Sequence, residues 1–214
     1  MDIPLEKRLK KRLHVDVGRL QDEVMEAAYA LDGALVFHGG TAIWRCFSGN
    51  RFSEDLDLYS SHPVKIAGGL SEILSSRALT LSKLKRTENL IFAKVTDGGA
   101  EVRLEINTSA KKSGAATRYE KMNGSRMDVL CLTPEELVVE KAAAYKNRRF
   151  VRDLYDIYHL SERVEGRPEA KAAVSSLLSS FKPPLDEANL SALVYSGAVP
   201  SVPQMLLALR RRFG

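Results

Sequence analysis

Cysteine is scarce in this sequence, and the two that occur, Cys46 and Cys131, lie far apart and outside any Cys-x-x-Cys or Cys/His cluster. Zinc sites and disulfide frameworks need several such residues at recurring spacings. The scarcity therefore argues against both kinds of site. We interpret the two residues as plain, mostly buried thiols.

Long apolar runs are also missing. No stretch approaches the roughly 18 residues that suggest a membrane span, and the basic start MDIPLEKRLKKRL lacks the apolar segment and cleavage site of a secretory signal. We therefore expect a cytoplasmic protein with no membrane partner. Repeats and low-complexity tracts are absent too, and with 214 residues, 44% of them hydrophobic, the chain can bury the core of one or two globular domains.

Acidic residues are outnumbered. The chain has 32 Lys and Arg against 27 Asp and Glu, a formal net charge of +5, and its basic residues gather at 7–12, 146–152 and 210–212. This balance favours polyanions as partners, although basic runs also solvate helix faces. Only a specific binding site can distinguish a polyanion partner from solvated helix faces.

The first part of the chain has the pattern of a mixed α/β sheet. Apolar spacing at 16–31 is typical of an amphipathic helix, GGTAIWRCF predicts a turn entering a helix, and another helix is expected near 64–77. Residues 111–117 are predicted to form a loop. Short apolar or alternating segments predict strands at 34–38, 55–59, 90–96 and 101–107, the last two joined as a hairpin by Asp97-Gly98-Gly99.

The second part of the chain is predicted to be helical. In TPEELVVEKAAAYKNRRF, Thr133 is expected as N-cap, Pro134 as the first helical residue and Glu136 as the partner in a capping box. RDLYDIYHLSERV predicts a second helix, and a third is expected at the C-terminal end. We therefore divide the chain into an α/β domain of residues 1–125 and a helical domain of residues 126–214.

Two aspartates separated by one leucine carry the functional prediction. On a strand, Asp55 and Asp57 point to the same face with Cα atoms about 6.5–7 Å apart. Their oxygens can converge on Mg²⁺, which takes one or two carboxylates and completes its shell with water and phosphate oxygens. The turn at Gly39, Gly40 and Thr41 begins a helix, whose free N–H groups attract a triphosphate. A phosphate cradle beside a metal site is what nucleotidyl transfer requires.

The run GGTAIWRCFSGNRFSEDLDLY, with RDLYDIYHL further on, resembles the AbiEii/AbiGii nucleotidyltransferases, which include toxins of toxin-antitoxin pairs and the related MenT enzymes. The resemblance extends roughly from residue 34 to residue 162. It implies an α/β fold, with a polymerase-β-like nucleotidyltransferase core built on a mixed sheet plus a C-terminal helical domain, that uses Mg²⁺ and a nucleoside triphosphate. The matching positions are Gly39, Gly40, Thr41, Arg51, Ser53, Asp55 and Asp57, followed by Lys141, Arg148, Arg152 and Asp153.

A third carboxylate is expected on a neighbouring strand. In EVRLEIN both Glu101 and Glu105 lie on one face with Arg103, and periodicity cannot choose between them. The resemblance favours Glu105, as metal support or as the base for the attacking hydroxyl. The alternative is a surface glutamate paired with Arg103 or Lys94.

The helical part supplies further candidates. Lys141 and Arg148 share a partly apolar face of their helix; Lys141 is predicted to hold the triphosphate as a catalytic cation and Arg148 to bind substrate. Asp153 needs a partner, which Lys141 or Arg148 could provide, so both a catalytic and a purely structural role stay open. Arg51 and Ser53 are expected to touch phosphate or to orient Asp55.

The sequence thus predicts an enzyme in which Asp55 and Asp57 bind Mg²⁺ and an acceptor hydroxyl attacks the α-phosphorus of a nucleoside triphosphate. The basic runs and the resemblance point to RNA as acceptor, above all the 3′ end of tRNA, while a protein hydroxyl stays open. The resemblance also implies a cognate antitoxin protein. Two other classes remain: a non-catalytic nucleotide- or RNA-binding module, and a phosphotransferase or glycosyltransferase that uses the aspartate pair for another donor.

Overall fold

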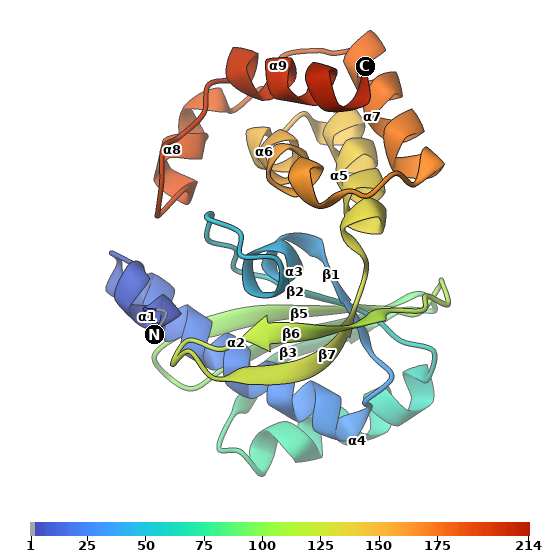
Figure 1. Cartoon of the computed structure of the whole chain (residues 1–214). Coiled ribbons are helices and arrows are strands. Elements are labelled where there is room, and N and C mark those ends of the chain that lie inside the picture. Colours follow the sequence, from blue (N-terminus) through green and yellow to red (C-terminus); the bar gives the residue numbers. More distant parts are fainter. Residues whose placement is uncertain (1–2) are drawn as a thin grey trace. The chain divides into compact units, whose positions relative to one another are not determined.

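The structure is a computed structural model that describes residues 3–214, and the chain forms two compact units (Figure 1). The first unit holds Ser53–Cys131 and the chain up to Cys46, whereas the second holds Phe47–Phe52 and Leu132–Gly214. None of the helices within residues 3–214 is long and apolar enough to cross a membrane.

The first unit is built on a mixed sheet with the strand order β3-β4-β5-β2-β1-β7-β6. The pairs β1–β7 and β2–β5 are parallel, and all the others are antiparallel. The α/β fold with a mixed sheet is thereby confirmed. The seven strands are β1 (Val36–His38), β2 (Leu56–Tyr59), β3 (Thr80–Arg86), β4 (Leu90–Thr96), β5 (Glu101–Asn107), β6 (Ala115–Glu120) and β7 (Arg126–Cys131).

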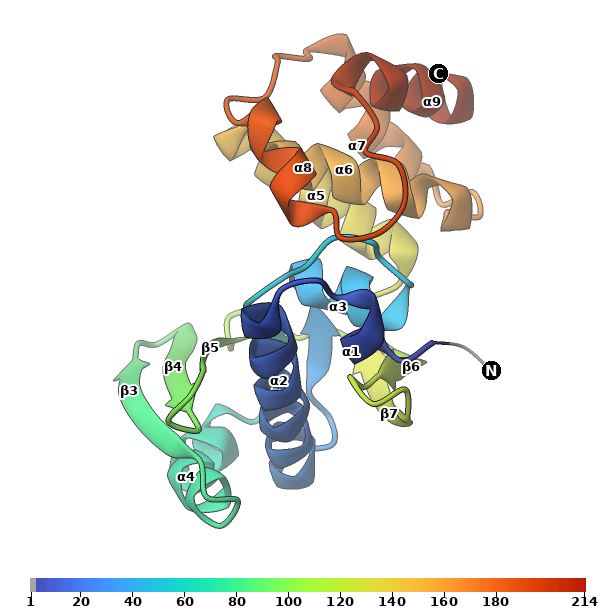
Figure 2. The ribbon, with the colours of Figure 1, turned by 90° about the vertical axis from the view of Figure 1, so that its left-hand side faces the viewer.

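Period-two alternation puts one face of the central strands into the core. Leu56 and Leu58 of β2 are fully buried, and each such side chain stabilises the fold by about 1.5–3 kcal/mol. Asp57 and Tyr59 therefore emerge on the other face. Among the helices, α2 (Arg12–Leu31) packs along α4 (Pro63–Ser75) and against β5 (Figures 1 and 2), while α3 (Gly39–Cys46) contacts β1, β2 and β6. The short α1 (Leu5–Arg8) precedes α2.

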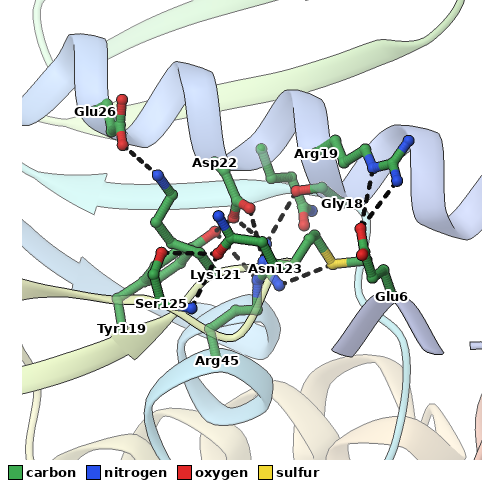
Figure 3. Close-up of polar contacts among 12 residues, drawn as sticks. Glu6, Gly18, Arg19, Asp22, Glu26, Arg45, Tyr119, Lys121, Asn123 and Ser125 are labelled. Carbon is green, nitrogen blue, oxygen red and sulfur yellow. Dashed lines mark hydrogen bonds and ion pairs between the residues drawn. The ribbon is translucent and has the colours of Figure 1, made fainter. Parts of the chain in front are cut away.

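A buried polar cluster joins α2, α3 and β6 (Figure 3). The side chain of Arg45 is wholly inaccessible; it pairs with the carboxylate of Asp22 and donates to the Gly18 carbonyl at 2.9 Å and to the Tyr119 hydroxyl at 3.1 Å. The Tyr119 hydroxyl in turn donates to Asp22 at 3.0 Å, and the Met122 amide donates to the other Asp22 oxygen at 2.7 Å. Because each charge has partners, the cluster can lie inside the unit without an unpaired ion.

The second unit is helical. The predicted capping box of α5 (Pro134–Arg148) is confirmed, with Glu136 N donating to Thr133 Oγ1 at 3.4 Å and Thr133 N to the Glu136 carboxylate at 2.9 Å. α5 packs against α6 and α7, and α9 packs against the same two helices. The other elements are α6 (Val151–Leu160), η1 (Ser161–Arg163), α7 (Pro168–Ser179), η2 (Glu187–Asn189), α8 (Leu190–Leu193) and α9 (Val202–Phe213).

Three strands differ from the sequence predictions. β3 was not predicted because it is an edge strand whose side chains are nearly all exposed, so no apolar alternation marks it. Part of the loop expected at 111–117 is strand β6, which pairs with β7. β7 itself lies beyond residue 125 yet pairs with β1 and β6, so the sheet continues past the boundary we expected. The assignment of nucleotidyltransferase and helical domains remains a prediction.

Candidate active site

The glycine turn and the second aspartate meet at the end of β1. His38 of β1 stands opposite Asp57 of β2, and Gly39 begins α3 with φ +78°. A Cβ atom on Gly39 would lie 2.1 Å from Asp57 Oδ2, far inside van der Waals contact. Only glycine permits this backbone conformation and leaves room for the carboxylate. The turn and the acid predicted from separate motifs therefore lie in direct contact.

Two buried side chains fix the approach to β2. The Thr41 hydroxyl donates to the Asp55 carbonyl at 2.5 Å, and Thr41 is fully buried, as is Gly40. The Gln21 amide donates to the carbonyls of Ser53 and Glu54, each at 2.9 Å. These bonds hold the segment before the strand against α2 and α3. They give Thr41 a positioning role in addition to any contact with phosphate.

Asp55 is engaged by a cation from the neighbouring strand. Arg103 of β5 donates from Nε and Nη2 to the two carboxylate oxygens, at 2.8 and 2.6 Å. The pair is partly exposed, with 49% of the Arg103 side chain and 31% of the Asp55 side chain accessible. The hydrogen bond to Asp55 raises the pKa of the Arg103 guanidinium. The sequence indicated Arg103 only as a possible partner for a glutamate.

Glu105 is the third carboxylate of this face. In the parallel pairing of β2 and β5 it stands opposite Asp57. Burial and then the like charge of Asp57 raise the pKa of the Glu105 carboxyl. Glu101 stands opposite Thr96 and pairs with Lys94 at 2.5 Å. The register thus favours Glu105 over Glu101 as the acid beside the aspartates.

The described residues contain no group of three His, Cys, Asp or Glu side chains already arranged to hold a metal ion. Both oxygens of Asp55 accept hydrogen bonds from Arg103. The donor set still suits Mg²⁺: Asp55, Asp57 and Glu105 offer hard oxygen ligands from adjacent strands. Burial and the like charge of Asp57 raise the pKa of Glu105, and a divalent cation would offset that like charge.

Three residues near this face were not among the predicted site residues: His38, Tyr59 and Lys112. The ring of His38 stacks on Tyr59 with centroids 4.1 Å apart, and Lys112 Nζ lies 5.9 Å from the Tyr59 ring centre. Tyr59 shares the face of Asp57 by its spacing of two. The sequence placed His38 on the strand before the turn, but nothing in it brings Lys112, from the segment before β6, to this face.

A cluster of ion pairs in the second unit holds Lys141, Arg148 and Asp153. Lys141 and Asp153 are buried, whereas 42% of the Arg148 side chain is exposed. Lys141 Nζ is 3.0 Å from Asp156 Oδ2 and 3.6 Å from Asp153 Oδ1. Arg148 donates to both oxygens of Asp153, each at 2.8 Å. Both of the partners proposed for Asp153 are therefore present, and these contacts support its structural role. Whether Lys141, Arg148 and Asp153 also serve catalysis remains a prediction.

Asp156 is the centre of this cluster, but it was not among the site residues predicted from the sequence. It accepts hydrogen bonds from Arg51 Nε at 2.6 Å and Nη2 at 2.7 Å, in addition to its contact with Lys141. Burial alone would raise the pKa of the Asp156 carboxyl, but Arg51 and Lys141 hold it below its usual value. Asp156 follows Asp153 by three positions, one helical turn, which is the signal that could have revealed it. Arg51, only 5% exposed, is engaged here, and its expected contact with phosphate remains a prediction.

Comparison with known proteins identifies a family. The family model of the nucleotidyl transferase AbiEii toxin, of type IV toxin-antitoxin systems, matches residues 23–197. No curated protein gives a significant match.

Several solved structures have the same fold. The nucleotidyltransferase toxin MenT4 of Mycobacterium tuberculosis is 17% identical, with a TM-score of 0.60 over 94% of this chain and 83% of that one. JHP933 of Helicobacter pylori is 20% identical, with a TM-score of 0.64 over 93% and 89%. The antibiotic-resistance factor ANT(2'')-Ia is 14% identical, with a TM-score of 0.50 over 77% and 92%. These likenesses concern the fold, whereas the family match covers most of the chain: this protein belongs to the AbiEii family of nucleotidyltransferase toxins and is a nucleotidyltransferase.

Proposed function

We propose that this enzyme is Mg²⁺-dependent and transfers a nucleoside monophosphate from a nucleoside triphosphate to RNA, with the 3′ end of tRNA as acceptor. The observation that carries the proposal is the contact between Asp57 and the Gly39 turn, with Glu105 opposite the same aspartate. It joins a backbone suited to phosphate with carboxylates suited to a divalent ion.

Each group of the first unit has a role in this reaction. Asp55 and Asp57 would hold Mg²⁺, which when bound supplies positive charge to the phosphate oxygens. The backbone N–H groups at Gly39 and Gly40 lie at the start of α3 and would bind the triphosphate. Glu105, whose pKa is raised by burial and by Asp57, is suited to accept the proton of the acceptor hydroxyl.

The transfer needs no covalent intermediate with the enzyme. The acceptor oxygen forms a bond to the α-phosphorus, its proton moves to Glu105, and the bond between the α-phosphorus and the bridging oxygen breaks. Pyrophosphate leaves with that oxygen. Lys141 is proposed to stabilise the leaving pyrophosphate and Arg148 and Ser53 to contact substrate, while Asp153 keeps the two cations in place.

RNA as acceptor rests on the basic composition and on the family to which the chain belongs. A phosphodiester backbone binds basic surfaces by releasing counterions, which gives affinity without sequence preference. Family membership also supports an antitoxin protein as partner, which would restrain the enzyme in the cell.

The decisive experiment incubates the protein with bulk tRNA and each of the four nucleoside triphosphates in turn, labelled with ³²P at the α or the γ position. Incorporation of α label alone supports the proposal. Incorporation of γ label alone would mean a phosphotransferase, and no incorporation with intact triphosphate binding would mean a binding module. Repeating the assay with EDTA and then excess Mg²⁺ tests the metal, since activity should disappear and return.

A further inference from the structure

The second unit contains a cavity of about 260 Å³ that none of the roles above uses. It lies where the ends of α5 and α7 meet the segment that follows α7. The lining includes Tyr145, Lys146, Arg149, Ser180, Phe181 and Lys182. Its volume lies just below the roughly 300–1,000 Å³ usual for small-ligand pockets, so it suits a single nucleotide at most.

The charge of this cavity is of one sign. Three of its lining residues, Lys146, Arg149 and Lys182, are cations, and none is acidic. Lys146 donates to the Ser176 hydroxyl at 2.7 Å, a neutral partner that leaves its charge uncompensated. Arg149 is the left-handed residue that ends α5, with φ 51°. Two acids outside the lining, Asp186 and Glu187, act on Tyr145, and Asp186 accepts a hydrogen bond from the Val151 amide at 2.6 Å.

An aromatic platform completes the cavity. Phe181 stacks on Tyr145 with ring centroids 5.8 Å apart and planes 10° from parallel. Tyr145 is buried, and its hydroxyl donates to the Lys182 carbonyl at 2.8 Å, which fixes the segment carrying both Phe181 and Lys182. Phe181 is half-buried and lines the cavity. A ring held in this way offers a surface on which a nucleic-acid base can stack without first being ordered.

The basic surface continues along the chain from the cavity. Phe150, the residue before α6, has the guanidinium groups of Arg148 and Arg152 at 5.4 and 5.3 Å from its ring centre. Cations interleaved with aromatic rings are the combination by which proteins bind single strands, since cations follow the phosphates and rings take the bases. An acidic protein segment would use the cations alone and has no need of the ring.

We propose that the cavity between α5 and α7 binds one nucleotide of single-stranded RNA, with its phosphates on Lys146, Arg149 and Lys182 and its base on Phe181. The inference rests on the proposed function in one respect: the strand bound here is the acceptor RNA. It assigns a binding site within the helical unit itself.

Fluorescence anisotropy of a short labelled single-stranded RNA, measured on the full chain without any nucleoside triphosphate over a series of salt concentrations, tests the proposal. Arg149→Asn with Lys182→Gln removes two phosphate contacts while asparagine tolerates the left-handed backbone. The dissociation constant should rise about tenfold or more, and the salt slope should fall by about 1.4, because each contact on a single strand contributes about 0.7. Arg210→Gln with Arg211→Gln, both exposed on α9, is the control of equal charge and should change binding much less.

The aromatic platform is tested separately. Phe181→Leu should weaken RNA binding about tenfold, and Phe181→Trp should restore it. Thermal unfolding of each variant confirms that it is folded. Equal losses of RNA affinity in the two double variants would overturn the proposal, and so would full RNA binding by Phe181→Leu. Stronger competition by polyglutamate than by unlabelled RNA would also overturn it. A different outcome separates the site from the proposed function. If the wild-type protein transfers no α label, but binds RNA and these variants lose that binding, the site is upheld and the proposed function is refuted.

Discussion

Arg103 and Asp55 form a two-point ion pair between β5 and the start of β2, with N–O distances of 2.8 and 2.6 Å. Asp55 is also one of the two aspartates proposed to bind Mg²⁺. A guanidinium on both oxygens takes up lone pairs that a divalent cation could use, and it places a like charge beside that cation. We therefore expect Arg103 to compete with metal at this carboxylate.

Arg103→Gln should shift the Mg²⁺ dependence of nucleotidyl transfer to lower concentrations. Exposed ion pairs contribute about 0.2–1 kcal/mol, so the half-activating concentration should fall by no more than about fivefold. A titration of α-label transfer against Mg²⁺ measures the shift. Arg118→Gln, which removes an exposed arginine paired with Asp128 at 3.0 Å, is the control and should leave the curve unchanged. Loss of activity at all Mg²⁺ concentrations would instead mean that Arg103 binds substrate.

Gly39→Ala should abolish most of the transfer activity. An added Cβ would lie 2.1 Å from Asp57 Oδ2 and would force the carboxylate away from the turn. Loss of a proposed metal ligand should reduce the rate by roughly a thousandfold, about 4 kcal/mol of transition-state stabilisation. Initial rates of α-label transfer at saturating Mg²⁺ give the measurement.

The matched control is Gly98→Ala in the turn between β4 and β5. Gly98 also has a positive φ, +91°, but nothing lies within 4 Å of the position of its Cβ. It therefore carries the same kind of backbone penalty without the clash, and its activity should be close to that of the wild type. Similar activity of the two variants would show that Asp57 does not need its place against the turn.

The site could be predicted to the extent that local patterns determine it. The glycine turn, the alternation of Asp55 and Asp57 with buried leucines, and the capping box of α5 each depend on neighbours in sequence. The pairing of Arg103 with Asp55 depends on the parallel register of β2 and β5, which no local pattern reveals. Exposed edge strands such as β3 likewise carry no apolar period, because their place in the sheet comes from backbone pairing.

Arg45→Met should destabilise the first unit by about 3–5 kcal/mol, because it leaves the Asp22 carboxylate buried without its cation. The Tyr119 hydroxyl and the Met122 amide would still donate to Asp22 but cannot neutralise it. Urea-induced unfolding followed by circular dichroism gives the change in free energy. Arg118→Met, from an exposed pair, should change it by less than about 1 kcal/mol. Equal midpoints for the two variants would contradict this role of the cluster.

Asp156→Asn should destabilise the second unit to a similar extent, about 3–5 kcal/mol, since Arg51 and Lys141 would lose their shared carboxylate. The pKa of Asp156 lies below its usual value, so its contribution is present at neutral pH and is lost as the pH falls through the lowered pKa. The difference between wild type and variant should therefore shrink in strong acid. Unfolding curves at neutral and acidic pH measure it, and a variant as stable as the wild type at neutral pH would refute it.

Glu105→Gln should stabilise the chain at neutral pH, which is the opposite of the effect expected for Asp156→Asn. Burial and Asp57 raise the pKa of Glu105 above the ordinary 4.5, so the folded chain keeps this proton to a higher pH than the unfolded chain does. Stability is therefore lost as the pH rises from about that ordinary value through the raised pKa. The glutamine variant escapes this loss: it should be more stable than the wild type at neutral pH, and the difference should vanish below the ordinary pKa.

Glu101→Gln is the natural control for this prediction, because the hydrogen bond from Lys94 lowers the pKa of Glu101. The pKa shift of Glu101 has the opposite sign, so at neutral pH the Glu101→Gln variant should be no more stable than the wild type. Urea midpoints of both variants at neutral and acidic pH provide the comparison. Added Mg²⁺ should reduce the advantage of Glu105→Gln, since a cation held by Asp55 and Asp57 offsets the repulsion that Glu105 experiences. If Glu105→Gln were less stable than the wild type at neutral pH, the crowding of three carboxylates on this face would be wrong.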